Sequence, residues 1–235
     1  SWSHASNIVY RLLIVPGSAR TACRPQAEGS LAMGSQWTKD SVYRKAMKAG
    51  YRARAAYKLL EIQRRNEIIR PDDNVVDLGA APGSWLQVIR ELTDGKVIGV
   101  DLNPIAPMEG VTTIIGDFTD PLVQERIREE AGGIVNIVVS DAAPKLSGQK
   151  SYDQARAIGL GEDALAFACT ILKPGGNLVI KSFQGELFGD LIAAMKQHFY
   201  SVRGYRTKAS RKGSAETYII AKNFKGKCDG VEGPL

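Results

Sequence analysis

Residues that bind metals or form disulfides are scarce in this sequence. Its three cysteines, Cys23, Cys169 and Cys228, lie far apart, no Cys-x-x-Cys pair occurs, and there are only two histidines. This pattern argues against a structural zinc site and against a framework of disulfides. We therefore predict no metal site, and a protein that works in the reducing cytoplasm.

Long apolar runs are also lacking. The longest one near the N-terminus, residues 8–15, is interrupted by Arg11 and is too short to span a membrane. A signal peptide is an alternative interpretation of this run, although no basic segment precedes it. Residues 1–35 show no clear periodicity, so we expect a poorly ordered N-terminal extension or tag. The domain itself is predicted over residues 36–222, followed by a tail at 223–235.

Two common nucleotide-binding patterns are absent as well. The turn DLGAAPG, residues 77–83, follows an apolar strand and opens a helix, but it is not G-x-G-x-x-G and has no Lys-Ser/Thr pair. This argues against dinucleotide and nucleoside triphosphate sites. Gly79 and Gly83 let the backbone approach a ligand closely, and Asp77 suits a cationic or amine-bearing ligand better than a pyrophosphate. A plain strand-to-helix turn is the alternative interpretation.

What the sequence does contain is a regular alternation of strands and helices, in a chain of 235 residues that is 44% hydrophobic. We predict strands at 74–78, 96–101, 111–116, 134–140, 177–182, 200–205 and 216–222. We predict helices at 84–92, 120–130, 152–172 and 186–199, after a basic helical region at 39–70. This order is typical of a parallel sheet with helices on both faces, in which ligands bind beyond the carboxyl ends of the strands.

Acidic residues stand at the ends of the first four predicted strands. They are Asp77, Asp101, Asp117 and Asp141. An acid after the second strand of such a sheet typically holds ribose hydroxyls. Each aspartate alone is more often a helix cap or a turn residue, but four at one edge of one sheet indicate a binding site.

Five ordered strings resemble the FtsJ/RrmJ family of ribose 2′-O-methyltransferases. They are YRARAAYKLLEI (51–62), DLGAAPGSW (77–85), SDAAPKLSG (140–148), KSFQG (181–185) and AETYIIA (215–221). The resemblance covers about residues 36–222 and implies a Rossmann-like α/β fold with a seven-stranded, mostly parallel sheet. It also implies that the last strand is antiparallel and that S-adenosyl-L-methionine is the cofactor.

The resemblance further implies a catalytic tetrad and a set of cofactor contacts. The tetrad falls on Lys58, Asp141, Lys181 and Glu216. The implied cofactor contacts are Gly83, Trp85, Asp101, Asp117 and Asp141, with Asp101 on the ribose hydroxyls and Asp117 near the adenine. Asp77 and Gly79, from the turn described above, complete the set of candidate cofactor residues. Two departures from the family pattern are Ser84, where many relatives carry Gly, and the Lys-Leu pair at 145–146.

The role of Lys181 stays open at this point. A ribose hydroxyl is a poor nucleophile until its proton is removed or held away, and a general base needs a pKa near the working pH. Free lysine titrates near about 10.4. Lys58 would favour the neutral form of Lys181, whereas Asp141 would favour the ammonium, which could instead orient the hydroxyl. A lone strand-end lysine is more often simply solvent-exposed.

Basic segments on both sides of the core predict an RNA partner. Residues 39–70 hold ten Lys or Arg and three acids, and residues 196–227 hold nine and one, in a chain of net charge +6. The interleaved Tyr43, Tyr51, Tyr57 and Tyr205 could stack on unpaired bases. A solvated charged face is the alternative for either segment alone. A 2′-hydroxyl acceptor requires RNA rather than DNA.

We therefore predict a monomeric methyltransferase that acts on a ribose, with uridine favoured, of large-subunit ribosomal RNA. The resemblance leaves a tRNA 2′-O-methyltransferase as the nearest alternative. A non-catalytic ribosome-assembly module and a small-molecule methyltransferase are further alternatives, but the intact tetrad argues against the first and the basic flanks argue against the second.

Overall fold

Short runs rich in valine and isoleucine form the inner strands of the sheet. The computed structural model describes residues 41–144, 147–210 and 214–226. Its strands are β1 (Val75–Leu78), β2 (Val97–Asp101), β3 (Val111–Ile115), β4 (Val135–Ser140), β5 (Leu172–Phe183), β6 (Phe199–Tyr205) and β7 (Glu216–Phe224). All four residues of β1 are buried, as expected for a central strand covered on both faces.

The sheet has seven strands in the order β3-β2-β1-β4-β5-β7-β6. Strands β1 to β5 pair in parallel, whereas β7 is antiparallel to both β5 and β6. This confirms the predicted mostly parallel sheet with an antiparallel last strand. It also brings the carboxyl ends of β1, β2, β3 and β4 to one edge.

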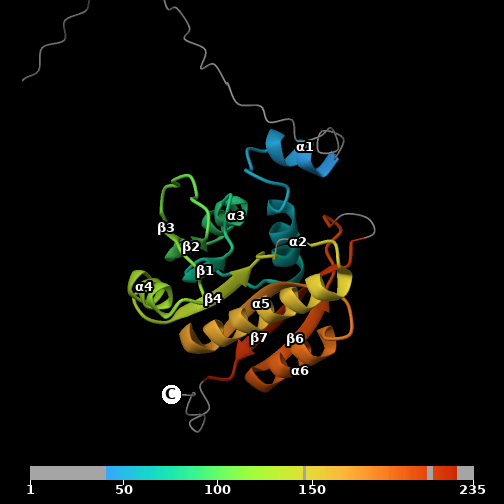
Figure 1. Cartoon of the computed structure of the whole chain (residues 1–235). Coiled ribbons are helices and arrows are strands. Elements are labelled where there is room, and N and C mark those ends of the chain that lie inside the picture. Colours follow the sequence, from blue (N-terminus) through green and yellow to red (C-terminus); the bar gives the residue numbers. More distant parts are fainter. Residues whose placement is uncertain (1–40, 145–146, 211–213, 227–235) are drawn as a thin grey trace, which may run out of the picture. The chain divides into compact units, whose positions relative to one another are not determined.

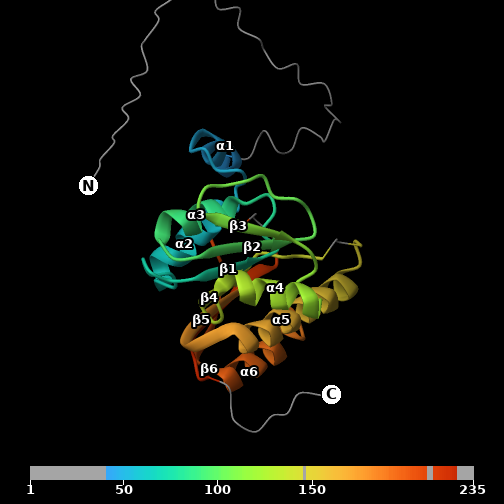
Figure 2. The same ribbon diagram turned by 90° about the vertical axis from the view of Figure 1, so that its left-hand side faces the viewer.

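Helices cover both faces of this sheet (Figures 1 and 2). They are α1 (Ser41–Lys48), α2 (Ala56–Asn66), α3 (Ser84–Leu92), α4 (Pro121–Ala131), α5 (Lys150–Ile171) and α6 (Phe188–His198). Side chains of α2 and α3, such as Leu59 and Leu86, belong to one hydrophobic cluster. Those of α4, α5 and α6, such as Ile127 and Leu191, belong to a second one. The two clusters are the two sides of a three-layered core.

Several boundaries differ from the sequence prediction, most of them by one or two residues. The basic region 39–70 is not one helix, because α1 ends at Lys48 and Gly50 takes a positive φ of 81° before α2 begins. Strand β5 begins at Leu172 and includes residues 173–176, which lie between the predicted helix and the predicted strand. Its register against β4 shifts between Val135 and Ile137. Strand β7 continues to Phe224, past the predicted domain boundary at 222.

Two of the predicted segments lie wholly or partly outside the described residues. The N-terminal extension, residues 1–35, and the end of the tail, residues 227–235, lie outside the described residues. Within the described ranges, none of the helices combines the length and the apolar run that crossing a membrane requires.

Candidate active site

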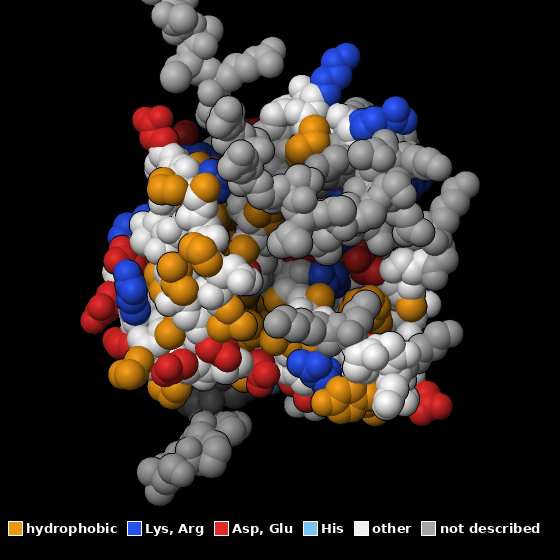
Figure 3. All heavy atoms as spheres, turned by 45° about the horizontal axis from the view of Figure 1, so that its top comes forward, with side chains coloured by type: hydrophobic (Ala, Val, Ile, Leu, Met, Phe, Trp, Pro, Cys, Tyr) orange, Lys and Arg blue, Asp and Glu red, His pale blue; other side chains and the backbone are white. Residues whose placement is uncertain are grey.

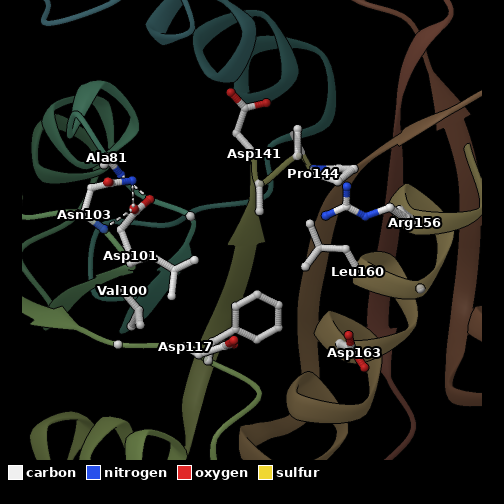
Figure 4. A pocket seen from close by; sticks show the side chains of 17 residues that line it. Ala81, Val100, Asp101, Asn103, Asp117, Asp141, Pro144, Arg156, Leu160 and Asp163 are labelled. Carbon is white, nitrogen blue, oxygen red and sulfur yellow. Dashed lines mark hydrogen bonds between the residues drawn. The ribbon is translucent and has the colours of Figure 1, made fainter. Parts of the chain in front are cut away.

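A cavity of about 670 Å³ opens at the carboxyl edge of the sheet. The turns after β1, β2, β3 and β4 form most of its wall, and α5 closes the other side (Figure 4). Three of the four predicted strand-end acids, Asp101, Asp117 and Asp141, line this cavity. The structure thus brings together residues that are up to 40 positions apart in sequence, counting from Asp101 to Asp141.

The turn after β1 packs tightly against the loop that follows β4. Gly79 has a φ of 72°, and a Cβ atom placed on it would lie 2.6 Å from the Cβ of Ala142. Gly83 has a φ of 99°, and a Cβ there would lie 2.6 Å from Nη1 of Arg52. Glycine adopts such a φ with the least strain, so the backbone favours glycine at both positions, and at Gly79 the packed backbone of Ala142 leaves no space for a Cβ.

The carboxylates of Asp101 and Asp117 are held in place by neighbouring donors. Asp101 accepts hydrogen bonds from the backbone N–H of Ala81 at 2.9 Å and of Asn103 at 2.8 Å (Figure 4). Asp117 accepts from the backbone N–H and the hydroxyl of Thr119, at 2.9 and 2.8 Å. These bonds fix two negative charges along the wall formed by the turns after β2 and β3.

Asp77 differs from these two acids, because it is fully buried and lies in a different space. It lines a smaller cavity of about 130 Å³ that also reaches Trp85 and Asp141. Neither carboxyl oxygen has a hydrogen-bond partner among the described residues. Burial, and then the nearby carboxylates of Asp141 and Asp101, raise the pKa of Asp77 well above its ordinary value. A buried group without partners is costly, so this site suits a ligand with a hydrogen-bond donor.

The four predicted tetrad side chains meet beside the larger cavity. Nζ of Lys58, from α2, lies 2.8 Å from a carboxylate oxygen of Glu216 and 3.9 Å from Oδ1 of Asp141. Nζ of Lys181, from β5, lies 3.3 Å from the same Oδ1 and also donates to the backbone carbonyl of Asp141. Figure 4 shows the carboxylate of Asp141 pointing away from α5 and toward α2. Asp141 therefore links the two lysines.

All four of these side chains are largely withdrawn from solvent. The exposed fraction is 10% for each lysine side chain, 17% for Asp141 and 15% for Glu216. Burial alone would raise the pKa of Glu216, but the Lys58 ammonium and hydrogen bonds from Lys58 and Ser210 lower it below its ordinary value. The two lysines and the two acids thus offset one another's charge in a site with little exposure to solvent.

Comparison with known proteins identifies the family of this chain. Residues 51–224 match the family of FtsJ-like methyltransferases. The chain belongs to this family.

Individual relatives agree with this assignment. A "Ribosomal RNA large subunit methyltransferase E" of Methanoculleus marisnigri is 90% identical over 86% of this chain and 100% of its own length. The protein of the same description from Methanoregula boonei is 66% identical over 83% of this chain and 100% of its own length. A Plasmodium falciparum crystal structure, provisionally described as a ribosomal RNA methyltransferase, is 28% identical. Its TM-score is 0.69, over 75% of this chain and 100% of its own.

Sequence reasoning missed one residue at the centre of this FtsJ-like site. The hydroxyl of Tyr218 donates to Oδ1 of Asp141 at 2.6 Å, and its ring packs 5.8 Å from that of Trp85. Burial, followed by the Asp141 carboxylate, raises the pKa of Tyr218 well above its ordinary value. Tyr218 follows Glu216 by two positions in a strand, so both side chains lie on one face. That spacing was a usable signal in the string AETYIIA.

The tyrosines of the basic segments are more involved in packing than the sequence suggests. The hydroxyl of Tyr51 donates to Glu91, and that of Tyr205 donates to Glu61, both at 2.9 Å. Tyr51 and Tyr57 pack edge to face with ring centroids 5.9 Å apart. The side chain of Tyr43 lies outside what the structure describes. Figure 3 shows basic and acidic side chains mixed on the face that it presents, with basic groups at the upper right, at the left margin and below the centre.

Proposed function

We propose that this FtsJ-like methyltransferase transfers a methyl group from S-adenosyl-L-methionine to a ribose 2′-hydroxyl of large-subunit ribosomal RNA. The observation that carries the proposal is the linked set of Lys58, Asp141, Lys181 and Glu216 beside the cavity. The printed descriptions of the two archaeal relatives support the choice of RNA. The basic segments supply charge for phosphate binding.

The residues present fit the proposed cofactor. Its ribose would be held by Asp101 and its adenine would lie near Asp117, both on one wall of the larger cavity. The smaller cavity is lined by Asp77, whose two carboxyl oxygens have no partner among the described residues and would suit the amine of an amino-acid moiety. When bound, the cofactor supplies a methyl group already activated on a sulfonium.

The geometry supports a donor role for Lys181. A lysine ammonium has three N–H donors, and two of them face oxygens of Asp141, one in the side chain and one in the backbone. We propose that the third binds the oxygen of the ribose hydroxyl and stabilises the charge that develops there. Asp141 and Tyr218 would fix the position of this ammonium, and Glu216 would hold Lys58 beside it.

Labelled methyl transfer tests the proposal. The purified protein, labelled S-adenosyl-L-methionine and isolated large subunits, small subunits or tRNA are incubated separately. We expect label in large-subunit RNA that is resistant to alkaline cleavage at one ribose. Label in tRNA alone would favour the alternative substrate, and no label in any RNA would overturn the proposed function.

Two lysine variants on the same strand test the site. Lys181→Ala should abolish transfer while the affinity for S-adenosyl-L-methionine, measured by calorimetry, is retained. Lys173→Ala removes an exposed lysine from the same β5 strand, near its amino end, and should behave like the wild type. Near-normal transfer by Lys181→Ala would remove Lys181 from the mechanism.

We also propose several broader features. The catalytic domain is proposed to extend from residue 36 to the end of β7, with residues 1–35 outside it. We propose that the protein is a monomer and that it acts in the cytoplasm. Neither a membrane nor DNA is proposed as a partner. Removing residues 1–35 and measuring both the melting temperature and methyl transfer tests the first of these.

A further inference from the structure

The first turn of α5 lies between the loop that follows β4 and the loop that follows β5. Asp153 is buried, and its carboxylate accepts hydrogen bonds from the backbone N–H of Ser147 at 2.7 Å and of Gly148 at 3.0 Å. These two residues end the loop that begins at Asp141. With its amide oxygen turned to the loop after β5, Gln154 accepts from the backbone N–H of Gly185 and Glu186, both at 3.1 Å. The start of α5 is therefore anchored to both sides of the site.

Two neighbouring side chains on this anchored turn are turned to solvent. Tyr152 is 54% exposed, an unusual state for a large aromatic residue of a packed helix. The guanidinium carbon of Arg156 lies 5.7 Å from the centre of the Tyr152 ring. Residues four positions apart lie on one face of a helix, so the two form a continuous aromatic and cationic surface.

Part of this surface lines the larger cavity, beside which the predicted tetrad lies. Arg156 lines that cavity together with Asp141 and Pro144. Figure 4 shows its guanidinium pointing from α5 toward Pro144, on the loop that carries Asp141. Asp141 in turn contacts Lys181. The guanidinium thus faces the loop that carries Asp141, and the exposed ring of Tyr152 lies next to it on α5.

We propose that Tyr152 and Arg156 bind the RNA nucleotide that adjoins the methylated ribose, with its base stacked on Tyr152 and a phosphate held by Arg156. The inference rests on the proposed RNA substrate and names residues outside the predicted tetrad and cofactor contacts. An exposed aromatic ring accepts any base by stacking, and a guanidinium offers paired donors to phosphate oxygens. Asp153 and Gln154 anchor the start of α5. The backbone that carries Tyr152 and Arg156 is therefore fixed before RNA binds, which reduces the entropic cost of binding.

A second exposed tyrosine provides a matched control. Tyr200 is 77% exposed, and Nζ of Lys225 lies 5.6 Å from the centre of its ring, so it presents the same kind of pair. It stands at the beginning of β6, where the neighbouring Phe199 pairs with Phe224 at the end of β7. That is the amino edge of the parallel strands, opposite the cavity. If exposure and cation contact alone determined RNA binding, the two tyrosines would be equivalent.

The experiment compares Tyr152→Ala, Tyr152→Phe and Tyr200→Ala in the full chain. Tyr152→Ala should raise the KM for the RNA substrate by about tenfold, as expected for the loss of one stacked base, with kcat little changed. Tyr152→Phe keeps the ring and should retain the wild-type KM, as should Tyr200→Ala. The melting temperature and the affinity for S-adenosyl-L-methionine should be the same in all four proteins.

A direct binding measurement separates this inference from the proposed function. Fluorescence anisotropy with a labelled single-stranded oligoribonucleotide should show weaker binding to Tyr152→Ala than to Tyr200→Ala, whether or not methyl is transferred. Equal KM and equal affinity for those two variants would overturn the role of Tyr152. If the wild type methylates no RNA but the binding difference persists, the proposed reaction fails while the nucleotide contact stands.

Discussion

The contact between Gly79 and Ala142 gives a prediction whose size can be worked out from the structure. In Gly79→Ala the new Cβ would lie 2.6 Å from the Cβ and 2.8 Å from the Cα of Ala142. Because the second atom belongs to the backbone, no side-chain rotation relieves the overlap. A positive φ costs a residue with a Cβ about 1–2 kcal/mol, and forcing an extra carbon into a packed contact costs about 1–3 kcal/mol. The expected loss in the free energy of unfolding is therefore about 2–5 kcal/mol.

Gly175→Ala separates the two contributions to this loss. Gly175 has a similar φ of 81°, but no atom lies within 4 Å of a Cβ placed there. It should lose only the cost of the backbone conformation, about 1–2 kcal/mol. Urea unfolding of both variants gives the two free energies, and each kcal/mol should lower the melting temperature by about 2–4 °C for a chain of this size.

The cavity supplies a second measurement on the same pair. Ala142 lines the larger cavity, so displacing it in Gly79→Ala should also weaken the binding of S-adenosyl-L-methionine, whereas Gly175→Ala should leave it unchanged. Equal stabilities of the two variants would refute the argument that the turn after β1 and the loop after β4 are packed too closely to admit a Cβ.

Three further predictions concern the acids and the buried tyrosine. Asp101→Ala should weaken the affinity for S-adenosyl-L-methionine by roughly 10- to 100-fold in calorimetry, since a hydrogen bond to a charged group is lost; unchanged affinity would contradict the ribose contact. Tyr218→Phe should lower the free energy of unfolding by about 1.5–3 kcal/mol, because its bond to the Asp141 carboxylate is removed, and an unaltered urea midpoint would show that the bond contributes nothing. The pKa of Glu216 is lowered in the folded protein, so its stabilising effect is fully present above the pKa of unfolded glutamate and is lost as the pH falls through the folded value. The stability difference between wild type and Glu216→Gln should hence be constant from neutral pH down to about 5 and shrink below about 4.3; a constant difference in acid would be the contrary result.

Features with strong local signals could be predicted from the sequence. The helix at 84–92 has the same bounds in the structure, because the glycine turn before it and the apolar spacing within it are both local. The common location of Asp101, Asp117 and Asp141 could also be predicted, because the carboxyl ends of parallel strands lie at one edge of the sheet. The antiparallel direction of the last strand came only from the family resemblance.

Features that depend on distant contacts could not be predicted. The full burial of Asp77 follows from its place within β1, between β2 and β4, and this pairing depends on segments distant in sequence. The exposure of Tyr152 was likewise invisible, because a tyrosine in a helical pattern is ordinarily counted with the core. The residues 173–176 contain Pro and two Gly and so indicated only the end of the helix, yet they continue β5 through an irregular pairing with β4.

The place of β7 between β5 and β6 has a consequence for how the enzyme is made. Strand β7 is the last of the described strands in sequence and carries Glu216 and Tyr218. Until it inserts, Lys58 lacks its nearer carboxylate and Asp141 lacks one hydrogen-bond donor. A nascent chain still lacking this strand would leave the edges of β5 and β6 unpaired. The ribosome therefore has to translate nearly the whole domain before the four tetrad residues can assemble. We expect shorter nascent chains to be inactive.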